Sequence, residues 1–343
     1  GEPVEREVAR ALVALRIATL ARGYSGVRPV IAERLADILN AGITPYVPRF
    51  GSLGASGDLA PLSHAGLLLL GEGEIVADDG TVQPAGVVLA AAGIAPLVLE
   101  AKEGLALING TEGMLGMLIV ACDDALRLFR TADIAAAMSI EGLLGTDRPF
   151  AADLQALRPH PGQAKSAANL RRMLRDSPLV AAHDDATHGV QDAYSLRCHP
   201  QVIGAGRDTL DFAVAIAERE LLASIDNPVI LPDGRVESVG NFHGEPLAFA
   251  CDFLTIAVAE VGAIAFQRID RLLDKNRSRG LPPFLAPDAG VNSGMMIAQY
   301  TAGALVAENR RLSHPASTDS MATSAMQEDH VSLGWASARN LRQ

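Results

Sequence analysis

The sequence predicts a mainly α protein, a bundle of long helices with a minor β element. Apolar residues recur at helical spacing along most of the chain, whereas alternating β-branched runs are scarce. The stretch 245–275 keeps this spacing with a single internal glycine, which is long for a globular helix and favours an extended bundle. With 343 residues, 49% of them hydrophobic, the chain can bury a substantial core.

The first predicted elements are two amphipathic helices followed by a hairpin. Apolar residues step by three and four over 8–15 and 35–39, and a glycine follows each run as a stop signal. Residues 73–84 are the best hairpin candidate, with Asp79-Gly80 as the turn. Helical patterns then return over 113–139 and 207–224, ahead of the long stretch already described.

Composition excludes several classes of protein. The net charge of −11, from 40 acidic and 29 basic residues, argues against nucleic-acid binding, which needs clustered basic side chains. The chain opens on a charged amphipathic helix rather than a signal peptide. The uncharged run 81–99 is interrupted by Pro84 and Pro96, so no membrane span is expected.

The cysteines predict a reducing compartment. Cys122, Cys198 and Cys251 are odd in number, widely spaced and set among apolar neighbours, so we expect buried free thiols and a cytoplasmic location. The histidines at 64, 160, 243 and 330 show no close pairing of the kind that binds metals. We therefore expect no metal and no diffusible cofactor.

Several short loops between the helices are unusually polar. They cover 107–113, 191–201, 238–246 and 324–334, and together they suggest one convergent site. Each loop also has an ordinary interpretation: an Asn-Gly turn, a surface pair on one helix face, loop hydrogen bonds, or a helix cap.

The run "GASGD" at 54–58 carries more specific chemistry. If the amide nitrogen of Gly57 attacks the carbonyl carbon of Ala55, a five-membered ring closes, and only a glycine bends that far without a clash. Loss of water and of the Ser56 hydroxyl then leaves a conjugated methylene, an electrophile made from protein alone. Asp58 is placed to move protons. The order Gly-Ala-Ser-Gly does not fit the nucleophile elbow of a serine hydrolase.

This run and the polar loops resemble one enzyme family. "GSLGASGDLAPLSH", "KEGLALINGTEGM", "QDAYSLRCHPQV", "NPVILPDGRVESVGNFHGEP", "RGLPPFL" and "SAMQEDHVSLG" occur in the order found in aromatic amino-acid ammonia-lyases. The resemblance implies a fumarase/aspartase-like long-helix bundle with the minor β element near the loop of the 4-methylideneimidazol-5-one group (MIO). It also implies that Ala55, Ser56 and Gly57 form this group, which makes the substrate amine a leaving group.

The resemblance further implies roles for individual residues. Tyr194 and Glu328 join the triad as catalytic residues, and Glu328 faces the substrate side chain. Arg197 holds the substrate carboxylate, for which a guanidinium is suited. Asn109, Gln191 and Asn241 line the substrate. Phe242 packs against the MIO and contributes both to the substrate site and to MIO formation. Asp58 assists MIO formation.

The motif Gln327-Glu328-Asp329-His330 favours the histidine-specific branch of the family, with elimination of ammonia from L-histidine to give urocanate. A lyase or aminomutase acting on tyrosine or phenylalanine is the alternative, and a catalytically impaired scaffold is another. The resemblance implies a homotetramer with shared active sites and an amino-acid substrate, without nucleic-acid or membrane partners.

The resemblance also divides the chain. Residues 1–112 are expected to be the remainder of the domain that bears the MIO, and 113–343 the central helix bundle, without the last helices of the family. No tyrosine equivalent to the family's candidate base precedes Ser56. Because that base is missing, we expect the chain by itself to have little activity.

Overall fold

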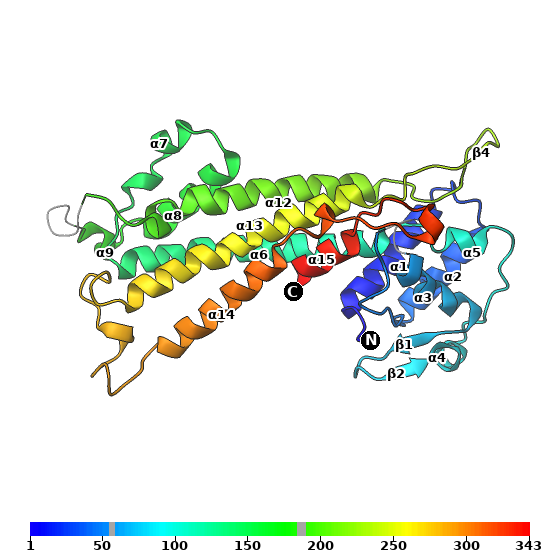
Figure 1. The fold of residues 1–343 in the computed structure, drawn as a ribbon, viewed down its shortest axis with the longest axis horizontal. Helices are drawn as coiled ribbons and strands as arrows, with labels where there is room; N and C mark the ends of the chain where they lie inside the picture. Colours follow the sequence, from blue (N-terminus) through cyan, green and yellow to red (C-terminus); the bar gives the residue numbers. More distant parts are fainter. Residues whose placement is uncertain (55–58, 184–189) are drawn as a thin grey trace. The chain divides into compact units, whose positions relative to one another are not determined.

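The computed structural model describes residues 1–54, 59–183 and 190–343 (Figure 1). By their internal contacts these form two compact units. Unit 1 comprises 1–121, 213–252 and 315–343, and unit 2 comprises 122–212 and 253–314. The sequence analysis expects one domain boundary, at 112/113. Each compact unit instead consists of several chain segments, because the chain passes between the units more than once along its long helices.

Long helices dominate the described chain, as the sequence predicts. They are α6 (Glu112–Gly142), α12 (His199–Leu221) and α13 (Glu245–Leu273). The start and end of α6 and α13 agree with the expected ranges within three residues. The start of α12 lies eight residues before the expected 207, since Pro200 occupies its second position, where a helix needs no amide hydrogen.

Unit 1 contains shorter helices around an apolar core. They are α1 (Arg6–Leu20), α2 (Pro29–Asn40), α3 (Leu59–Gly66), α4 (Ala85–Ala91), α5 (Glu103–Ala106) and α15 (Gly334–Arg342). The core includes Leu12, Ile31, Leu62, Leu69 and Leu89, which come from the first four of these helices and the 3₁₀ turn after α3. This core includes Leu62 and Ala65 of α3, the helix that follows the Ala55-Ser56-Gly57 triad in sequence.

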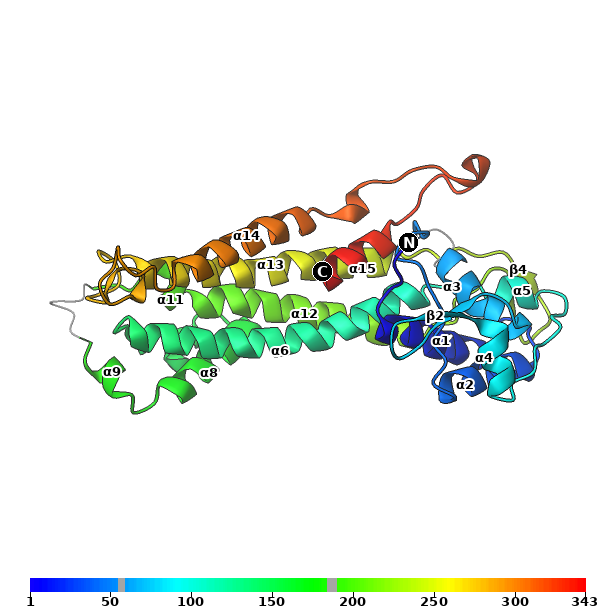
Figure 2. The same ribbon diagram turned by 90° about the horizontal axis from the view of Figure 1, so that it is seen from below.

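Unit 2 adds further helices to its parts of the long ones. They are α7 (Ala152–Ala156), α8 (Pro161–Leu174), α9 (Pro178–Ala181), α11 (Tyr194–Arg197) and α14 (Met296–Leu312). Within this unit α6, α12 and α13 run side by side (Figures 1 and 2). Short 3₁₀ turns lie at Leu67–Leu70, Arg148–Phe150, Pro283–Leu285, Ala316–Thr318 and Ser324–Met326.

The predicted hairpin is confirmed, and a second one is present. Strands β1 (Glu74–Val76) and β2 (Val82–Pro84) pair antiparallel, and Gly80 in their turn has φ +82°. Strands β3 (Val229–Ile230) and β4 (Val236–Glu237) form the hairpin that the sequence analysis missed, although Asp233-Gly234 is a turn signal. Both hairpins are too short to form a layer of their own.

The apolar run 81–99 forms β2, α4 and irregular backbone. Among the described residues one helix, α13, is long and apolar enough to cross a membrane by length and composition, with a mean hydropathy of 1.9 and half of its apolar window buried. A core helix of a bundle passes the same test.

Two of the three thiols are buried as expected. Cys122 and Cys251 are buried and Cys198 is half-buried, and none of the three forms a disulfide with another described residue. Burial raises the pKa of Cys122 to about 11, so this thiol stays protonated and unreactive at neutral pH.

A buried polar network joins the three long helices within unit 2. Asp133 on α6 accepts hydrogen bonds from Nε2 of His199 at 3.0 Å and from Nη2 of Arg207 at 2.6 Å, both on α12. Nδ1 of His199 lies 3.3 Å from Nη1 of Arg268 on α13. Because a guanidinium only donates, Nδ1 accepts, and the imidazole is neutral with its proton on Nε2.

His199 and Asp133 in this network both have lowered pKa values. Burial lowers the pKa of His199, and the charges of Arg268 and Arg207 lower it further. The hydrogen bond with Asp133 raises it, but by less than these effects together. Burial alone would raise the pKa of Asp133, but hydrogen bonds from His199 and Asn169 and the charge of Arg207 outweigh it. The folded protein therefore holds His199 neutral and Asp133 ionised.

We expect the free energy of unfolding to fall as the pH drops below about 6.5, the ordinary pKa of histidine. The unfolded chain then takes up a proton at His199 that the folded chain refuses, at a cost of up to about 1.4 kcal/mol per pH unit. Asp133 acts in the same direction only below about pH 4. Urea unfolding between pH 5 and 8 should show a flatter decline for His199→Gln than for wild type. The exposed His160→Gln is the control, and equal slopes for wild type and His199→Gln would contradict this origin.

Candidate active site

The residues Ala55, Ser56, Gly57 and Asp58 lie outside the described residues. The site is therefore built from the chain on either side of them and from the segments that hold that chain in place. Gly54 precedes the triad, and α3 begins at Leu59 directly after Asp58. Burial lowers the pKa of His64 on this helix, so its imidazole is biased toward the neutral form.

The segment before the triad is docked on residues 332–335. The Leu333 amide donates to the Leu53 carbonyl at 2.8 Å, and the Ser332 hydroxyl donates to the Gly54 carbonyl at 3.2 Å. The indole of Trp335, almost wholly buried, donates to the Arg49 carbonyl at 2.8 Å. These bonds link chain positions nearly 280 residues apart in the sequence, so a distant segment fixes the approach to the triad.

Gly54 is required at its position for two reasons. Its φ is +73°, in the region that glycine favours. A Cβ there would lie 2.1 Å from Oγ of Ser332 and 2.9 Å from the Gly334 amide nitrogen. The backbone of Gly54 therefore lies too close to residues 332–334 for any side chain.

We expect Gly54→Ala to lower the free energy of unfolding by about 2–3 kcal/mol, the sum of left-handed strain and a displaced Ser332. Gly42→Ala is the matched control, since Gly42 has φ +76° with open space around it and should cost only about 1 kcal/mol. Denaturant unfolding measures the free energy of unfolding of both variants, and the difference between their losses is the cost of the contact between the new Cβ and Ser332. Equal losses would show that the contact with Ser332 is unimportant.

Asn109 lies in a buried polar cluster of unit 1. Its Nδ2 donates to the Leu105 carbonyl at 3.2 Å and to the Asn227 carbonyl at 3.4 Å. Its own carbonyl accepts from Nη1 of Arg16 at 2.8 Å. The same guanidinium nitrogen pairs with Oε1 of Glu112 at 2.7 Å, and both side chains are almost fully buried. The Asn-Gly turn interpretation of this residue omits these long-range contacts, which fix its position.

Asn241, Phe242 and Glu328 belong to unit 1 as well. Asn241 is exposed and Phe242 half-buried, and both lie just before α13. Glu328 closes a tight loop: its backbone pairs with Thr323, and Oε2 accepts from the Thr323 hydroxyl at 2.7 Å. The second carboxylate oxygen of Glu328 makes no hydrogen bond to the described residues, and the side chain is half-buried.

Gln191, Tyr194 and Arg197 are brought together in unit 2. Nη2 of Arg197 donates to Oε1 of Gln191 at 2.9 Å, and its guanidinium carbon lies 4.7 Å from the centre of the Tyr194 ring. Tyr194 is 70% exposed, and Arg197 is half-buried. The cluster presents a phenol and a guanidinium together, which suits recognition of a carboxylate.

Asp192 anchors this cluster and was not anticipated from the sequence. Its carboxylate is 1% exposed and accepts from Nη2 of Arg279 at 2.7 Å and from the Thr146 amide at 2.8 Å. Since Asp192 lies between Gln191 and Tyr194, these bonds fix the start of α11. The sequence motif at 279–285 includes Arg279, but nothing in that motif indicates that Arg279 pairs with Asp192.

A prosthetic group made from the triad fits the residues present. The group needs no external ligand donors, only a chain whose flanks are held, and the cradle of Ser332 and Gly334 around Gly54 provides this on one side. Phe242 and Asn109, to which the sequence analysis gives places around this group, lie in the same unit as Gly54. Their roles stay predictions.

Comparison with known proteins places the chain in a family. The model of the aromatic amino acid lyase family matches residues 1–343. Proteins named histidine ammonia-lyase from Streptomyces coelicolor and Streptomyces griseus are each 64% identical over 342 residues, and one from Deinococcus radiodurans is 52% identical over 344. The chain spans about two thirds of the length of these relatives, 67%, 66% and 65%.

Solved structures agree with the fold. A histidine ammonia-lyase from Trypanosoma cruzi superposes with a TM-score of 0.89 at 44% identity, over 99% of this chain and 64% of that one. A tyrosine aminomutase from Streptomyces globisporus gives 0.92 at 45% identity, over 100% and 68%. The chain is therefore a member of the aromatic amino acid lyase family, and the predicted mainly α fold is confirmed.

Proposed function

We propose that the protein catalyses the non-oxidative elimination of ammonia from L-histidine to give urocanate. The observation that carries this proposal is the 64% identity to two histidine ammonia-lyases along the whole chain. The solved histidine ammonia-lyase and tyrosine aminomutase are 44% and 45% identical to this chain and superpose with TM-scores of 0.89 and 0.92. Because neither the shared fold nor identity to these two structures separates the activities, the proposal rests on the relatives that are 64% identical.

The MIO formed from Ala55, Ser56 and Gly57 supplies an electrophile that makes the substrate amine a better leaving group. The chain's own residues bind and orient the amino acid. Arg197 offers a guanidinium whose Nη2 is already aligned by Gln191, so it can pair with the substrate carboxylate. Glu328 offers a carboxylate oxygen beyond the one held by Thr323, which can accept from a substrate imidazole.

The substrate preference follows from this pairing. An imidazole N–H gives Glu328 a charge-assisted hydrogen bond, whereas the phenyl ring of phenylalanine has no polar atom to match the carboxylate. A site built to bond a polar group rejects an analogue that lacks it by about 10⁴-fold or more. Glu328 is thus the proposed determinant of substrate choice.

A direct test incubates the chain with L-histidine, L-tyrosine or L-phenylalanine at equal concentration and quantifies products by liquid chromatography and mass spectrometry. Urocanate from histidine, with little product from the other two, is the expected result, and Glu328→Gln should reduce it. A faster reaction of tyrosine, or a β-amino acid product, would support the lyase or aminomutase alternative. Because the sequence analysis expects little activity from the chain by itself, the ratio of the three products identifies the substrate, and only a complete absence of product favours an impaired scaffold.

We also propose that the protein assembles as a homotetramer with active sites shared between chains, in a cytoplasmic setting. The apolar face of α14 supports assembly: Ile297, Tyr300 and Leu305 are 59–60% exposed, and of this helix only Leu312 is buried. Cysteines that form no disulfide among the described residues are consistent with a reducing compartment.

Leu305→Asp is expected to shift the protein to a species of smaller mass, because it places a charge in an apolar contact. Size-exclusion chromatography with light scattering measures the mass. Leu305→Met, which keeps the position apolar, should behave as wild type. A monomeric wild-type chain at micromolar concentration would refute the role given to α14.

A further inference from the structure

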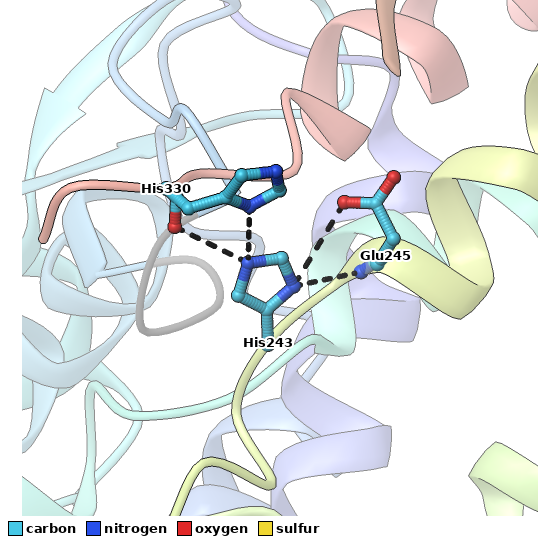
Figure 3. Close-up of side chains that lie close together, drawn as sticks. All are labelled: His243, Glu245 and His330. Carbon is cyan, nitrogen blue, oxygen red and sulfur yellow. Dashed lines mark hydrogen bonds and ion pairs between the residues drawn. The ribbon is translucent and has the colours of Figure 1, made fainter. Parts of the chain in front are cut away.

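Three potential metal ligands converge in unit 1 (Figure 3). His243 lies just before α13, Glu245 is the first residue of that helix, and His330 comes from the segment that precedes α15. One donor atom from each lies within 4.8 Å of the donors of the other two. Among residues 1–54, 59–183 and 190–343, no second group of this kind was found.

The two imidazoles are stacked at an interplanar angle of 29°, with one nitrogen of each ring at the contact. Nε2 of His243 lies 3.3 Å from Nδ1 of His330, and the ring centres are 5.4 Å apart. Zinc binds histidine nitrogen at about 2.0–2.1 Å in a tetrahedral arrangement, which separates two such ligands by about 3.3 Å. The spacing of the two nitrogens therefore already fits one ion between them.

Glu245 lies on the other side of His243. Its Oε2 is buried, has no hydrogen-bond partner, and is 4.0 Å from Nδ1 of His243. Metal-binding histidines commonly donate their second nitrogen to a carboxylate, which orients the ring and strengthens the ligand. A buried carboxylate oxygen without a partner is costly, so this atom needs a donor.

We propose that His243 and His330 bind a divalent transition metal of the zinc type, with Glu245 holding His243 from behind. The metal takes Nε2 of His243 and Nδ1 of His330, and water fills its remaining positions. The proton of His243 then resides on Nδ1, and a small rotation of the Glu245 side chain that closes the present 4.0 Å separation lets Oε2 accept it. The site is open to solvent, because His330 is exposed and His243 is only partly buried.

Without a metal, hydrogen bonds among His243, His330 and Glu245 account for some of these distances. Nε2–H of His243 can be shared between Nδ1 and the carbonyl oxygen of His330, at 3.3 and 3.2 Å, while its Nδ1 accepts from the Glu245 amide at 3.3 Å. All three distances are long for such bonds, and Oε2 of Glu245 stays unpaired. The metal-bound arrangement gives ligands or partners to both histidine nitrogens and to Oε2 of Glu245, and in exchange it releases the Glu245 amide and the His330 carbonyl from His243.

The metal would act on structure rather than on the reaction itself. It would join the start of α13 to a segment 87 residues later, two residues from Glu328. This inference departs from the sequence analysis, which expected no metal because the histidines are far apart in sequence. It stands independently of the proposed reaction, since it concerns metal affinity alone.

The test uses the full chain after treatment with a chelator. Isothermal titration with Zn²⁺ should show one ion per chain, and Co²⁺ should give the visible absorption of a site with nitrogen ligands. His330→Asn should abolish this binding, and Glu245→Gln should weaken it about tenfold, the usual effect of losing a carboxylate behind a metal-bound histidine. Zn²⁺ should also raise the melting temperature of wild type but not of His330→Asn.

His314→Asn is the matched control, because it removes another exposed histidine outside the cluster and should leave binding unchanged. Far-UV circular dichroism of each variant checks that the fold is kept. The proposal is overturned if wild type fails to bind Zn²⁺, or if His330→Asn binds it as tightly as wild type. Neither result would bear on ammonia elimination, which is measured separately.

Discussion

Ser56→Ala is expected to abolish ammonia elimination, with kcat reduced by about 10⁴-fold or more, as when the nucleophile of other covalent catalysts is removed. Alanine has no hydroxyl to lose, so the conjugated methylene cannot form, and the substrate amine stays a poor leaving group. KM should change much less, because Arg197 and the other binding residues are untouched. Product formation from L-histidine by wild type and variant measures the effect.

Intact mass and peptide mapping give this prediction a second readout. The wild-type peptide that contains residues 55–57 should be lighter than its sequence by two water molecules, and the Ser56→Ala peptide should not show this two-water deficit. Gly57→Ala should also prevent ring closure, since a Cβ hinders the approach of its amide nitrogen to Ala55. An unmodified wild-type mass together with normal turnover would refute the electrophile.

Arg16→Ala is expected to lower the free energy of unfolding by about 3–5 kcal/mol, the usual cost of stranding a buried partner charge. Glu112 and Arg16 are 3% and 2% exposed, and the guanidinium also donates to the carbonyls of Asn109 and Ile225. Removal of the guanidinium leaves the buried carboxylate of Glu112 with a hydrogen bond from the Thr19 hydroxyl, at 3.0 Å. Urea unfolding at pH 7 measures the loss.

The controls separate burial from charge. Arg311→Ala breaks an exposed ion pair with Glu308 and should leave the unfolding midpoint almost unchanged. The double variant Arg16→Met with Glu112→Leu should regain part of the lost stability, because no unpaired charge remains. If Arg16→Ala unfolds as wild type does, the pair does not hold the turn of Asn109 in place.

Helices and the first hairpin were predictable because their signals are local. The apolar spacing over 245–275 predicts α13 closely, and Asp79-Gly80 predicts the turn between β1 and β2. The start of α12 was less predictable, since a proline at its second position looks like a helix breaker in sequence but is tolerated in a first turn. The second hairpin was missed because its strands have only two residues each.

The site was partly predictable because family motifs lie in single short loops. Gln191, Tyr194 and Arg197 fall within seven residues, and the structure brings their side chains into contact. Asp192 and Arg279 are 87 residues apart, and nothing in sequence spacing indicates that they pair. Docking of Gly54 on Ser332 is of the same kind, a contact between segments that only folding brings together.

By itself the sequence determined the helical fold, the order of the motifs and the chemistry that Ala55-Ser56-Gly57 can perform, because propensity, periodicity and bond formation depend on neighbouring residues. Only the tertiary structure decided that Arg16 fixes the Asn109 turn, that Asp192 holds the start of α11, and that His243, Glu245 and His330 converge. Those contacts depend on how distant segments pack, which burial and steric fit select over the whole chain and no local pattern encodes.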